Sequence, residues 1–224
     1  MADRRADRGP ARPRLATLRL PDVTQADPDD VLSGDDDLDG VEIVGLRCEE
    51  LVWTGRRRLG ESLVRDLVVT RWEAAGASLV ESRLDTCEVV ALSAPDSQWR
   101  SVELRQSRIG SAELYDAELR SVEFVGCKFG FLNLRGARLT DVSFTDCIIE
   151  GLDLMRATAT RVAFEGSRIA RAELTGSKLT DFDLRGARLA DVGDPQGLRG
   201  ATITLEQLLD LAPSMAARLG IRVE

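Results

Sequence analysis

The sequence contains no histidine, few aromatic residues and no catalytic signature. Histidine serves general acid–base and metal chemistry near neutral pH, so its absence removes the common catalytic triads and many metal sites. There is no phosphate loop of the G-x-x-x-x-G-K-S/T type and no nucleophile elbow. The sequence therefore predicts a protein that is not an enzyme and that holds no cofactor or metal.

Cysteine is scarce, and its spacing argues against disulfide or metal chemistry. The four cysteines form no C-x-x-C pair. Three of them recur at the same place in the repeat described below, where the other copies have serine or alanine. We expect these to be small buried wall residues. They are Cys87, Cys127 and Cys147, with Cys48 outside that set.

No apolar run reaches the 18 residues that a membrane span needs, and the opening "MADRRADRGPARPR" lacks the apolar core of a signal peptide. These features predict a soluble, cytoplasmic protein without membrane contact. Residues 1–20 are basic and rich in arginine and proline, a composition typical of a disordered segment.

What the sequence does have is a five-residue period. From Leu104 to Leu189, each fifth residue is large and apolar, apart from Ala159. The residue two places earlier is mostly small, and the one between them is mostly polar. Neither a helix nor a single flat strand returns a side chain to one face every five residues. A three-residue strand followed by a two-residue corner does, and glycines at the second corner position suit a positive φ. These glycines are Gly126, Gly136, Gly166, Gly176 and Gly186.

A second period, of twenty residues, sets the number of corners. Blocks such as "SVEFVGCKFGFLNLRGARLT" and "DVSFTDCIIEGLDLMRATAT" align, so Phe124, Phe144 and Phe164 share one column. Four sides of five residues close one coil of a square tube, and successive coils stack about 4.8 Å apart.

The chain resembles the pentapeptide repeat proteins, whose loose consensus is A(D/N)LXX. The resemblance covers about residues 41–192 and is clearest in "ELTGSKLTDFDLRGARLADV". It implies an all-β solenoid: a right-handed quadrilateral β-helix of pentapeptide repeats with a short C-terminal α-helical cap. We divide the chain into a basic N-terminus (1–20), an acidic lead-in (21–40), the β-helix (41–200) and a C-terminal module (201–224).

The repeat frame shifts near the start of the tube. Residues 41–53 fit one frame and residues from 67 onward fit another. Between them lies "TGRRRLGE", residues 54–61, which we interpret as a loop ejected from the tube. Arg56, Arg57 and Arg58 in this loop are candidate contacts with a protein partner.

The C-terminal segment "TLEQLLDLAPSMAARLGIRVE" has the pattern of helix. Thr204 and Gln207 form a capping box, and Pro213 suits the start of a second short helix. One apolar face is expected to cover the end of the tube, with Leu211 off that face and free for a second contact. Either the module only caps the tube, or it also joins two copies, as in gyrase-directed members of the family; we favour a dimer. The candidate cap or dimer residues are Leu205, Leu208, Leu209, Leu211, Met215 and Leu219.

The net charge of −8 is unevenly distributed. Residues 21–50 hold eleven acidic residues and one arginine, whereas residues 71–180 are close to balance. In the predicted tube, Glu103 and Glu123 share one outward column, and Glu113, Asp153 and Glu173 share another. Arg108, Lys128, Arg168 and Arg188 form a basic column between them. Such columns are ordinarily solvated faces.

The stretch "DDDLDG", residues 35–40, begins like a calcium loop. The position of the bidentate glutamate holds Leu46, which fits the inward rhythm of the first coil. We therefore interpret the stretch as an acidic approach to the tube, with calcium as a lesser alternative.

Two functional hypotheses follow, both based on protein–protein interaction without direct nucleic acid binding. By resemblance, the protein is a DNA-mimicking partner of DNA gyrase or another type II topoisomerase, using the two acidic columns. This hypothesis conflicts with the near-balanced charge of the tube. Alternatively the tube is a rigid scaffold for a different protein. Its candidate contacts are the outward apolar residues Tyr115, Phe131, Ile148 and Met155.

Overall fold

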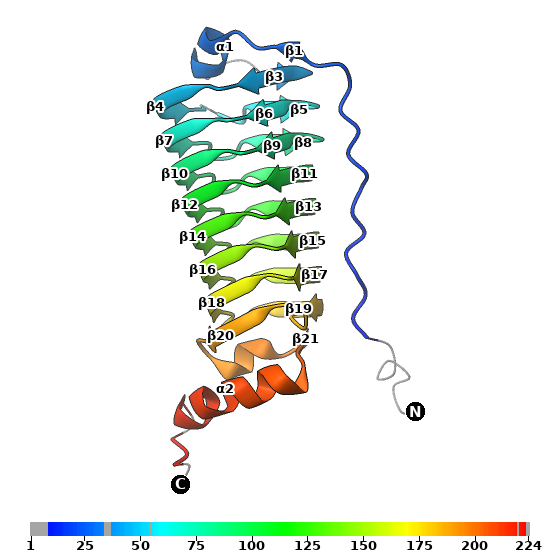
Figure 1. Ribbon diagram of the computed structural model, residues 1–224, viewed down its shortest axis with the longest axis vertical. Helices are drawn as coiled ribbons and strands as arrows, with labels where there is room; N and C mark the ends of the chain where they lie inside the picture. The colour runs from blue at the N-terminus through cyan, green and yellow to red at the C-terminus, as the bar shows by residue number, and fades with distance from the viewer. Residues whose placement is uncertain (1–8, 34–36, 54, 219, 223–224) are drawn as a thin grey trace.

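The computed structural model describes residues 9–33, 37–53, 55–218 and 220–222. Over these residues the chain winds into a long tube of stacked coils (Figure 1). The fold is the quadrilateral β-helix that the repeat predicts, with helix α1 (Pro28–Ser33) at the N-terminal end and helix α2 (Leu205–Arg218) at the C-terminal end. Among these residues no helix has the length and apolarity to span a membrane.

The strands form two parallel sheets that wrap the tube. Each longer strand bends across one corner and so serves two sides of the coil. One sheet contains β1 (Thr24–Gln25), β2 (Leu38–Asp39), β3 (Val41–Val44), β5 (Arg58–Gly60), β6 (Leu63–Arg65), β8 (Ser78–Val80), β9 (Arg83–Asp85), β11 (Gln98–Arg105), β13 (Glu118–Val125), β15 (Arg138–Thr145), β17 (Thr158–Glu165), β19 (Lys178–Asp183) and β21 (Ala201–Thr202). The other contains β4 (Arg47–Val52), β7 (Val68–Glu73), β10 (Glu88–Ser93), β12 (Arg108–Glu113), β14 (Lys128–Asn133), β16 (Ile148–Asp153), β18 (Arg168–Glu173) and β20 (Arg188–Val192).

The register of the sheets confirms the twenty-residue coil. Phe124 pairs with Phe144, and Phe144 pairs with Phe164. Their rings stack at 4.7 Å in both steps, with interplanar angles of 10° and 3°. All three side chains are buried, as are the small residues two places earlier. The interior is therefore a ladder of apolar side chains along the tube axis, which buries apolar area in every coil.

The prediction that residues 54–61 form a loop outside the tube is wrong. Leu51 pairs with Trp72, a separation of 21 residues, whereas Leu59 pairs with Leu79, a separation of 20. A single extra residue between Trp53 and Arg58 accounts for the frame shift. The rest of the stretch belongs to the tube, since Arg58–Gly60 is strand β5 and Leu59 is fully buried.

The corners turn through residues with positive φ, but glycine is only one of the solutions. Gly136 has φ 67°, as the sequence predicts, and equivalent corners are taken by Asp116 (57°) and Asp146 (52°). Aspartate tolerates this region better than most residues with a Cβ. Gly186 is an exception to the prediction because its φ is not positive; there a Cβ would lie 2.7 Å from the Phe164 carbonyl oxygen.

The acidic segment before residue 41 contributes to the first coil. Strand β1 pairs with β3, and β2 pairs with β5, both in parallel. Val31, in helix α1, is buried within the core cluster. The N-terminal end of the tube is thus covered by the segment that we describe as a lead-in.

The conformation of the basic N-terminus differs from the disorder that its composition predicts. Residues 1–8 lie outside the described residues, but residues 9–20, here called the arm, run in an extended conformation along the side of the tube (Figure 1). The arm reaches from the level of β19 toward β1, against the direction of coil winding. Three of its backbone N–H groups donate to tube side chains.

The C-terminal module is one helix, not two. Helix α2 continues through Pro213 as far as Arg218. The capping box is confirmed, since the Thr204 N–H donates to Gln207 Oε1 at 2.7 Å and the Gln207 N–H donates to Thr204 Oγ1 at 3.1 Å. A short 3-10 helix, Pro195–Leu198, precedes it.

Candidate interaction surfaces

The outward columns lie where the repeat predicts, but most of their acids are engaged. Glu103 pairs with Glu123 in the register of β11 and β13. Arg83 Nε lies 2.8 Å from Glu103 Oε2, and Arg105 Nη2 lies 2.9 Å from the same oxygen. Arg105 also approaches Glu123 at 3.8 Å. The negative charge of this column is therefore largely offset by arginines of the tube itself.

The second acidic column behaves similarly. Asp153 is only 4% exposed; its carboxylate accepts from Arg135 Nε at 2.7 Å and from the Met155 N–H at 3.0 Å. Glu113 accepts from the Asn133 amide at 2.5 Å. Glu173 accepts from the Thr175 N–H at 3.1 Å. Asp153 is thus a structural residue of its corner, and free negative charge stays on Glu113 and Glu173 alone.

The basic column contrasts with the acidic ones. Arg108, Lys128, Arg168 and Arg188 align along one sheet, with Ile148 between them. Their side chains make no ion pair or hydrogen bond with another described residue. This column therefore presents four cations that have no ion pair in the described part of the chain, with Glu88 beside Arg108 at its head.

The three arginines at the shifted corner have different environments, so they do not form one contact loop. Arg57 is 3% exposed; its guanidinium donates to the carbonyl oxygens of Val31 (2.9 Å) and Asp30 (2.7 Å) and lies 5.2 Å from the ring centre of Trp53. Arg58 pairs with Asp39 at 2.6 Å. Arg56 alone is exposed and without such a partner among the described residues. Arg57 holds helix α1 on the end of the tube and is not available to a partner.

The possible calcium loop lies partly outside the described residues. Of its visible carboxylates, Asp37 accepts the Arg58 N–H at 2.7 Å and Asp39 forms the ion pair with that arginine's guanidinium. No group of three or more cysteine, aspartate or glutamate side chains is placed to hold a metal within the described ranges.

Helix α2 presents the opposite face from the one expected. Gln207 and Leu211 are buried against the tube, with exposures of 7% and 1%. Leu205, Leu208 and Leu209 point to solvent, with exposures of 72%, 43% and 64%. Met215 packs partly against the core, and Leu219 lies outside the described residues. The molecule therefore carries a leucine stripe, Leu205, Leu208 and Leu209, on its C-terminal tip.

Gln207 explains this orientation. Its side-chain amide donates to the carbonyl oxygens of Leu184 (2.6 Å) and Ala187 (2.7 Å) in the last coil. The Leu184 carbonyl also accepts the Ala187 N–H at 2.9 Å. In earlier coils the carbonyl at the place of Ala187 in the five-residue repeat accepts an N–H of the following coil, as Ala157 does from Lys178. Ala187 has no such following coil, and an unpaired buried carbonyl is costly. The need for a donor at the open end turns the glutamine inward and the leucines outward.

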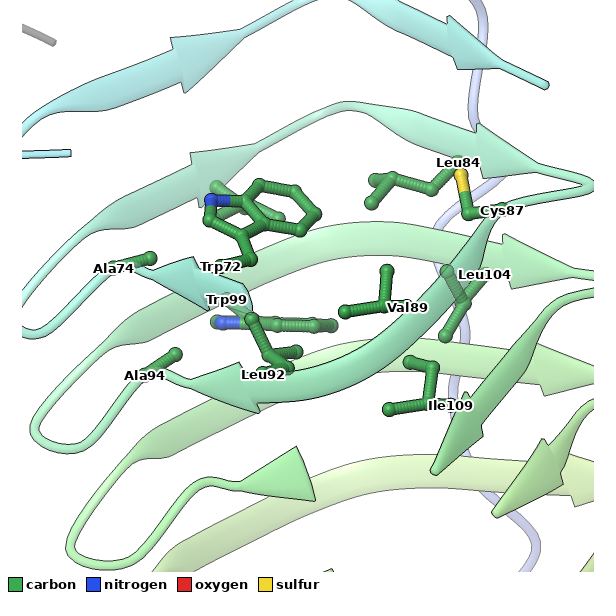
Figure 2. Close-up of a pocket in the computed structure, with 11 residues that line it drawn as sticks. Trp72, Ala74, Leu84, Cys87, Val89, Leu92, Ala94, Trp99, Leu104 and Ile109 are labelled. Atoms are coloured by element: carbon green, nitrogen blue, oxygen red, sulfur yellow. The ribbon is translucent and has the colours of Figure 1, made fainter. Parts of the chain in front are cut away.

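Within the described residues, the hollow in the apolar interior is too small for a substrate. The enclosed hollow between Trp72, Trp99 and Cys87 is lined by apolar side chains and measures about 10 Å³, no more than one water molecule needs (Figure 2). Burial raises the pKa of the Cys87 thiol to about 12, which keeps it protonated and unreactive at neutral pH. Cys48, Cys87, Cys127 and Cys147 are all free thiols.

Comparison with known proteins agrees with this geometry. Residues 97–174 and 117–193 match the family described as pentapeptide repeat region. Residues 97–193 are a pentapeptide repeat region. The pentapeptide tube extends beyond that match on the N-terminal side, since β3 to β10 continue the same ladders with looser sequence. No curated protein matches the chain.

Solved structures similar to this pentapeptide tube include those of QnrB1, described as a plasmid-mediated fluoroquinolone resistance protein. A trypsin-treated QnrB1 variant is 16% identical, with 85% of this chain and 99% of that chain covered and a TM-score of 0.36. Full-length QnrB1 is 15% identical, with 84% and 100% covered and a TM-score of 0.27. These similarities concern the fold and carry no statement about activity.

Proposed function

We propose that this protein is a non-catalytic rod that acts by binding other proteins, and that the leucine stripe of helix α2 joins two copies at their C-terminal tips. The observation that carries the proposal is the outward position of Leu205, Leu208 and Leu209. A cap needs its apolar residues against the tube, and here Leu211 fills that role, with Met215 packing partly against the core. Three solvent-exposed leucines at the end of a rod indicate a surface that another molecule covers.

A second copy is the occupant that best suits the stripe. The stripe is apolar along its length and therefore complementary to itself, which is the requirement of a twofold interface. It lies at the end of the tube, so pairing through it leaves all four sides of both tubes open. The protein-binding sides of a dimer would then run along one extended rod.

Light scattering of the purified protein at micromolar concentration tests this assembly. We expect a mass of twice 24.5 kDa for the wild type. Leu209→Asp should give the monomer mass, because it would bury two carboxylates at the interface. Ala217→Asp adds the same charge to an exposed position of the helix away from the stripe and should stay dimeric. A wild-type monomer mass, or a dimeric Leu209→Asp, would contradict the proposal.

The absence of catalysis is part of the same proposal. Its support is the apolar, filled interior together with carboxylates that are held in ion pairs on the outside. A general acid needs a desolvated carboxyl facing a substrate pocket. A cytoplasmic location stays a prediction from the sequence.

The narrower hypothesis names DNA gyrase or another type II topoisomerase as the partner. Its mechanism, mimicry of DNA by the two acidic columns, needs a row of free negative charges. The ion pairs of Glu103 and Asp153 argue against that mechanism, so gyrase binding would have to use Glu113, Glu123 and Glu173, or another surface. Gyrase can therefore be the partner even if the acidic columns do not form the contact surface.

A gyrase supercoiling assay, with and without a quinolone, answers both. If gyrase is the partner, the wild type at tens of micromolar inhibits supercoiling or relieves the drug. Glu113→Lys with Glu123→Lys should weaken the effect at least tenfold if the columns make the contact. Glu88→Lys with Glu118→Lys, on exposed positions outside the two acidic columns, is the control. No effect of the wild type would refute the hypothesis, and equal potency of both pairs would refute mimicry.

A further inference from the structure

The arm is held to the tube by its backbone. The Ala11 N–H donates to Asp181 Oδ1 at 3.0 Å, the Arg14 N–H donates to Asp141 Oδ1 at 2.8 Å, and the Ala16 N–H donates to Ser121 Oγ at 2.7 Å. Ser121, Asp141 and Asp181 occupy the same corner of three different coils, and we call them the corner ladder; Arg161 holds that corner in the coil between Asp141 and Asp181. Because these three contacts use N–H groups of the arm, they select its extended conformation, and any preference for arginine comes from the charge of the ladder.

The first step of the arm matches the spacing of the ladder. An extended polyproline II segment advances about 3.1 Å per residue, so the three residues from Ala11 to Arg14 span about 9.3 Å. Asp181 and Asp141 are two coils apart, about 9.6 Å at the usual strand spacing. Pro10 and Pro13 restrict the arm to this conformation and leave the donating N–H groups in place. An extended segment can therefore bond to Asp181 and Asp141 together, while the Ala16 contact with Ser121 follows after only two residues.

Charge favours the same pairing. The arm contains three arginines and no acidic residue. Asp141 is 8% exposed beneath it and also accepts from Arg161 at 2.5 and 2.7 Å, which fixes its carboxylate toward the arm. Arg161 chiefly, and the Arg14 N–H in addition, hold the pKa of Asp141 below its usual value, so it is ionised at neutral pH. The corner ladder thus offers three fixed acceptors to an extended chain, with Arg161 paired to Asp141 between them and the carboxylate of Asp181 outside that ion pair.

The arm is bound but shallowly seated. None of its residues is buried; Pro10, Pro13, Leu15, Leu18 and Leu20 are half-buried and the others exposed. A groove of about 410 Å³ stays open between the arm and the adjoining side of the tube. It is lined by Arg12, Pro13 and Leu15 of the arm and by Ser143, Ala163 and Asp183 of the tube, among others. Segments with few buried contacts open at low free-energy cost.

From these contacts we infer that the corner ladder and its groove are a docking site for extended segments of partner proteins that contain arginine and proline, and that the arm is a built-in occupant which such a segment replaces. The inference rests on the proposed protein-binding function and names the chemistry of the partner. Because the arm is part of the same chain, its effective concentration at the site is in the millimolar range. A partner segment must compete with the arm at that concentration.

Titration of a fluorescent peptide of residues 9–20 against the full chain tests the inference. The released-arm variant combines Ala11→Pro with Ala16→Pro, which removes two of the three donors without a change of charge. We expect anisotropy to show binding to this variant at least tenfold tighter than to the wild type, as expected for a site of about 100 µM freed from a millimolar competitor. Adding Asp141→Asn to the variant should remove most of that gain.

Two controls make the result decisive. Thr17→Pro also adds a proline to the arm at an exposed position, but the Thr17 N–H has no acceptor among the described residues, so this variant should behave as the wild type. A peptide with its three arginines changed to glutamate should not bind. The inference is overturned if the peptide does not bind the released-arm variant at about 1 mM, the effective concentration of the tethered arm, if release brings no gain, or if the acidic peptide binds equally. Such a result would leave the leucine-stripe dimer and its light-scattering test unaffected.

Discussion

At the scale of single residues, adjacent side chains in the sequence point to opposite sides of the tube wall. Phe144 is fully buried between Phe124 and Phe164, while Ser143 beside it points outward and contacts Thr145 Oγ1 at 3.3 Å. The alternation comes from the three-residue strand on each side of the coil. It lets a short sequence motif determine which side chains form the core.

Replacing Phe144 with aspartate should abolish folding or cost more than about 4 kcal/mol, because it removes a stacked ring and buries an unpaired carboxylate. Replacing Ser143 with aspartate should cost less than about 1 kcal/mol, mainly through repulsion from Glu123 in the next coil. Urea unfolding followed by circular dichroism measures both. Equal midpoints for the two variants would mean that the inward and outward assignment is wrong.

Residue patterns predicted the core well and the corners less well. The period of five identifies inward positions because burial depends on side-chain size and polarity. The conformation of a corner depends on the backbone, which Asp116 and Asp146 solve as well as Gly136 does. Gly186 has no positive φ and is required by close approach to Phe164, which no local pattern announces.

At the scale of elements, the largest differences from sequence-based expectation lie at the two ends of the tube. Local periodicity identified the strands and the capping box of α2. It misplaced the apolar face of α2 because Leu205, Leu208 and Leu209 outnumber Leu211. The orientation follows instead from Gln207, whose amide bonds to the Ala187 carbonyl at the end of the tube. It also missed the arm, whose hydrogen-bond partners lie 105 to 170 residues away.

The corner between Trp53 and Arg58, where the repeat frame shifts, gives a prediction about the stability of the N-terminal end of the tube. Arg57→Ala should lower the free energy of unfolding by about 3 kcal/mol, because the carbonyls of Asp30 and Val31 lose a charged donor in a buried setting. Arg56→Ala, one residue earlier and exposed, should change it by less than about 0.5 kcal/mol. Chemical unfolding of the two variants beside the wild type is the measurement. A similar, small effect for both would indicate that residues 54–61 do form a loop outside the tube.

At the scale of the whole molecule, inward side chains provide stability and outward side chains are available for recognition. The apolar ladders hold the coils together, and outward side chains can vary without disturbing them. The outside is divided into two partly neutralised acidic columns, an unpaired basic column, the arm on its corner ladder and the leucine stripe at the tip. Sequence reasoning located the charged columns but could not tell which charges were paired, because the pairing depends on the direction of each arginine side chain: Arg83 reaches Glu103 from another coil and Arg105 reaches it from two residues away.

Small-angle scattering of the wild type at micromolar concentration tests the tip-to-tip rod most directly. About nine coils at 4.8 Å make a tube of roughly 43 Å before the end helices are added. We predict a mass of twice 24.5 kDa together with a maximum dimension about double that of the Leu209→Asp monomer and an unchanged cross-section. A monomer mass, or a dimer with the length of the monomer and a doubled cross-section, would contradict assembly through the leucine stripe.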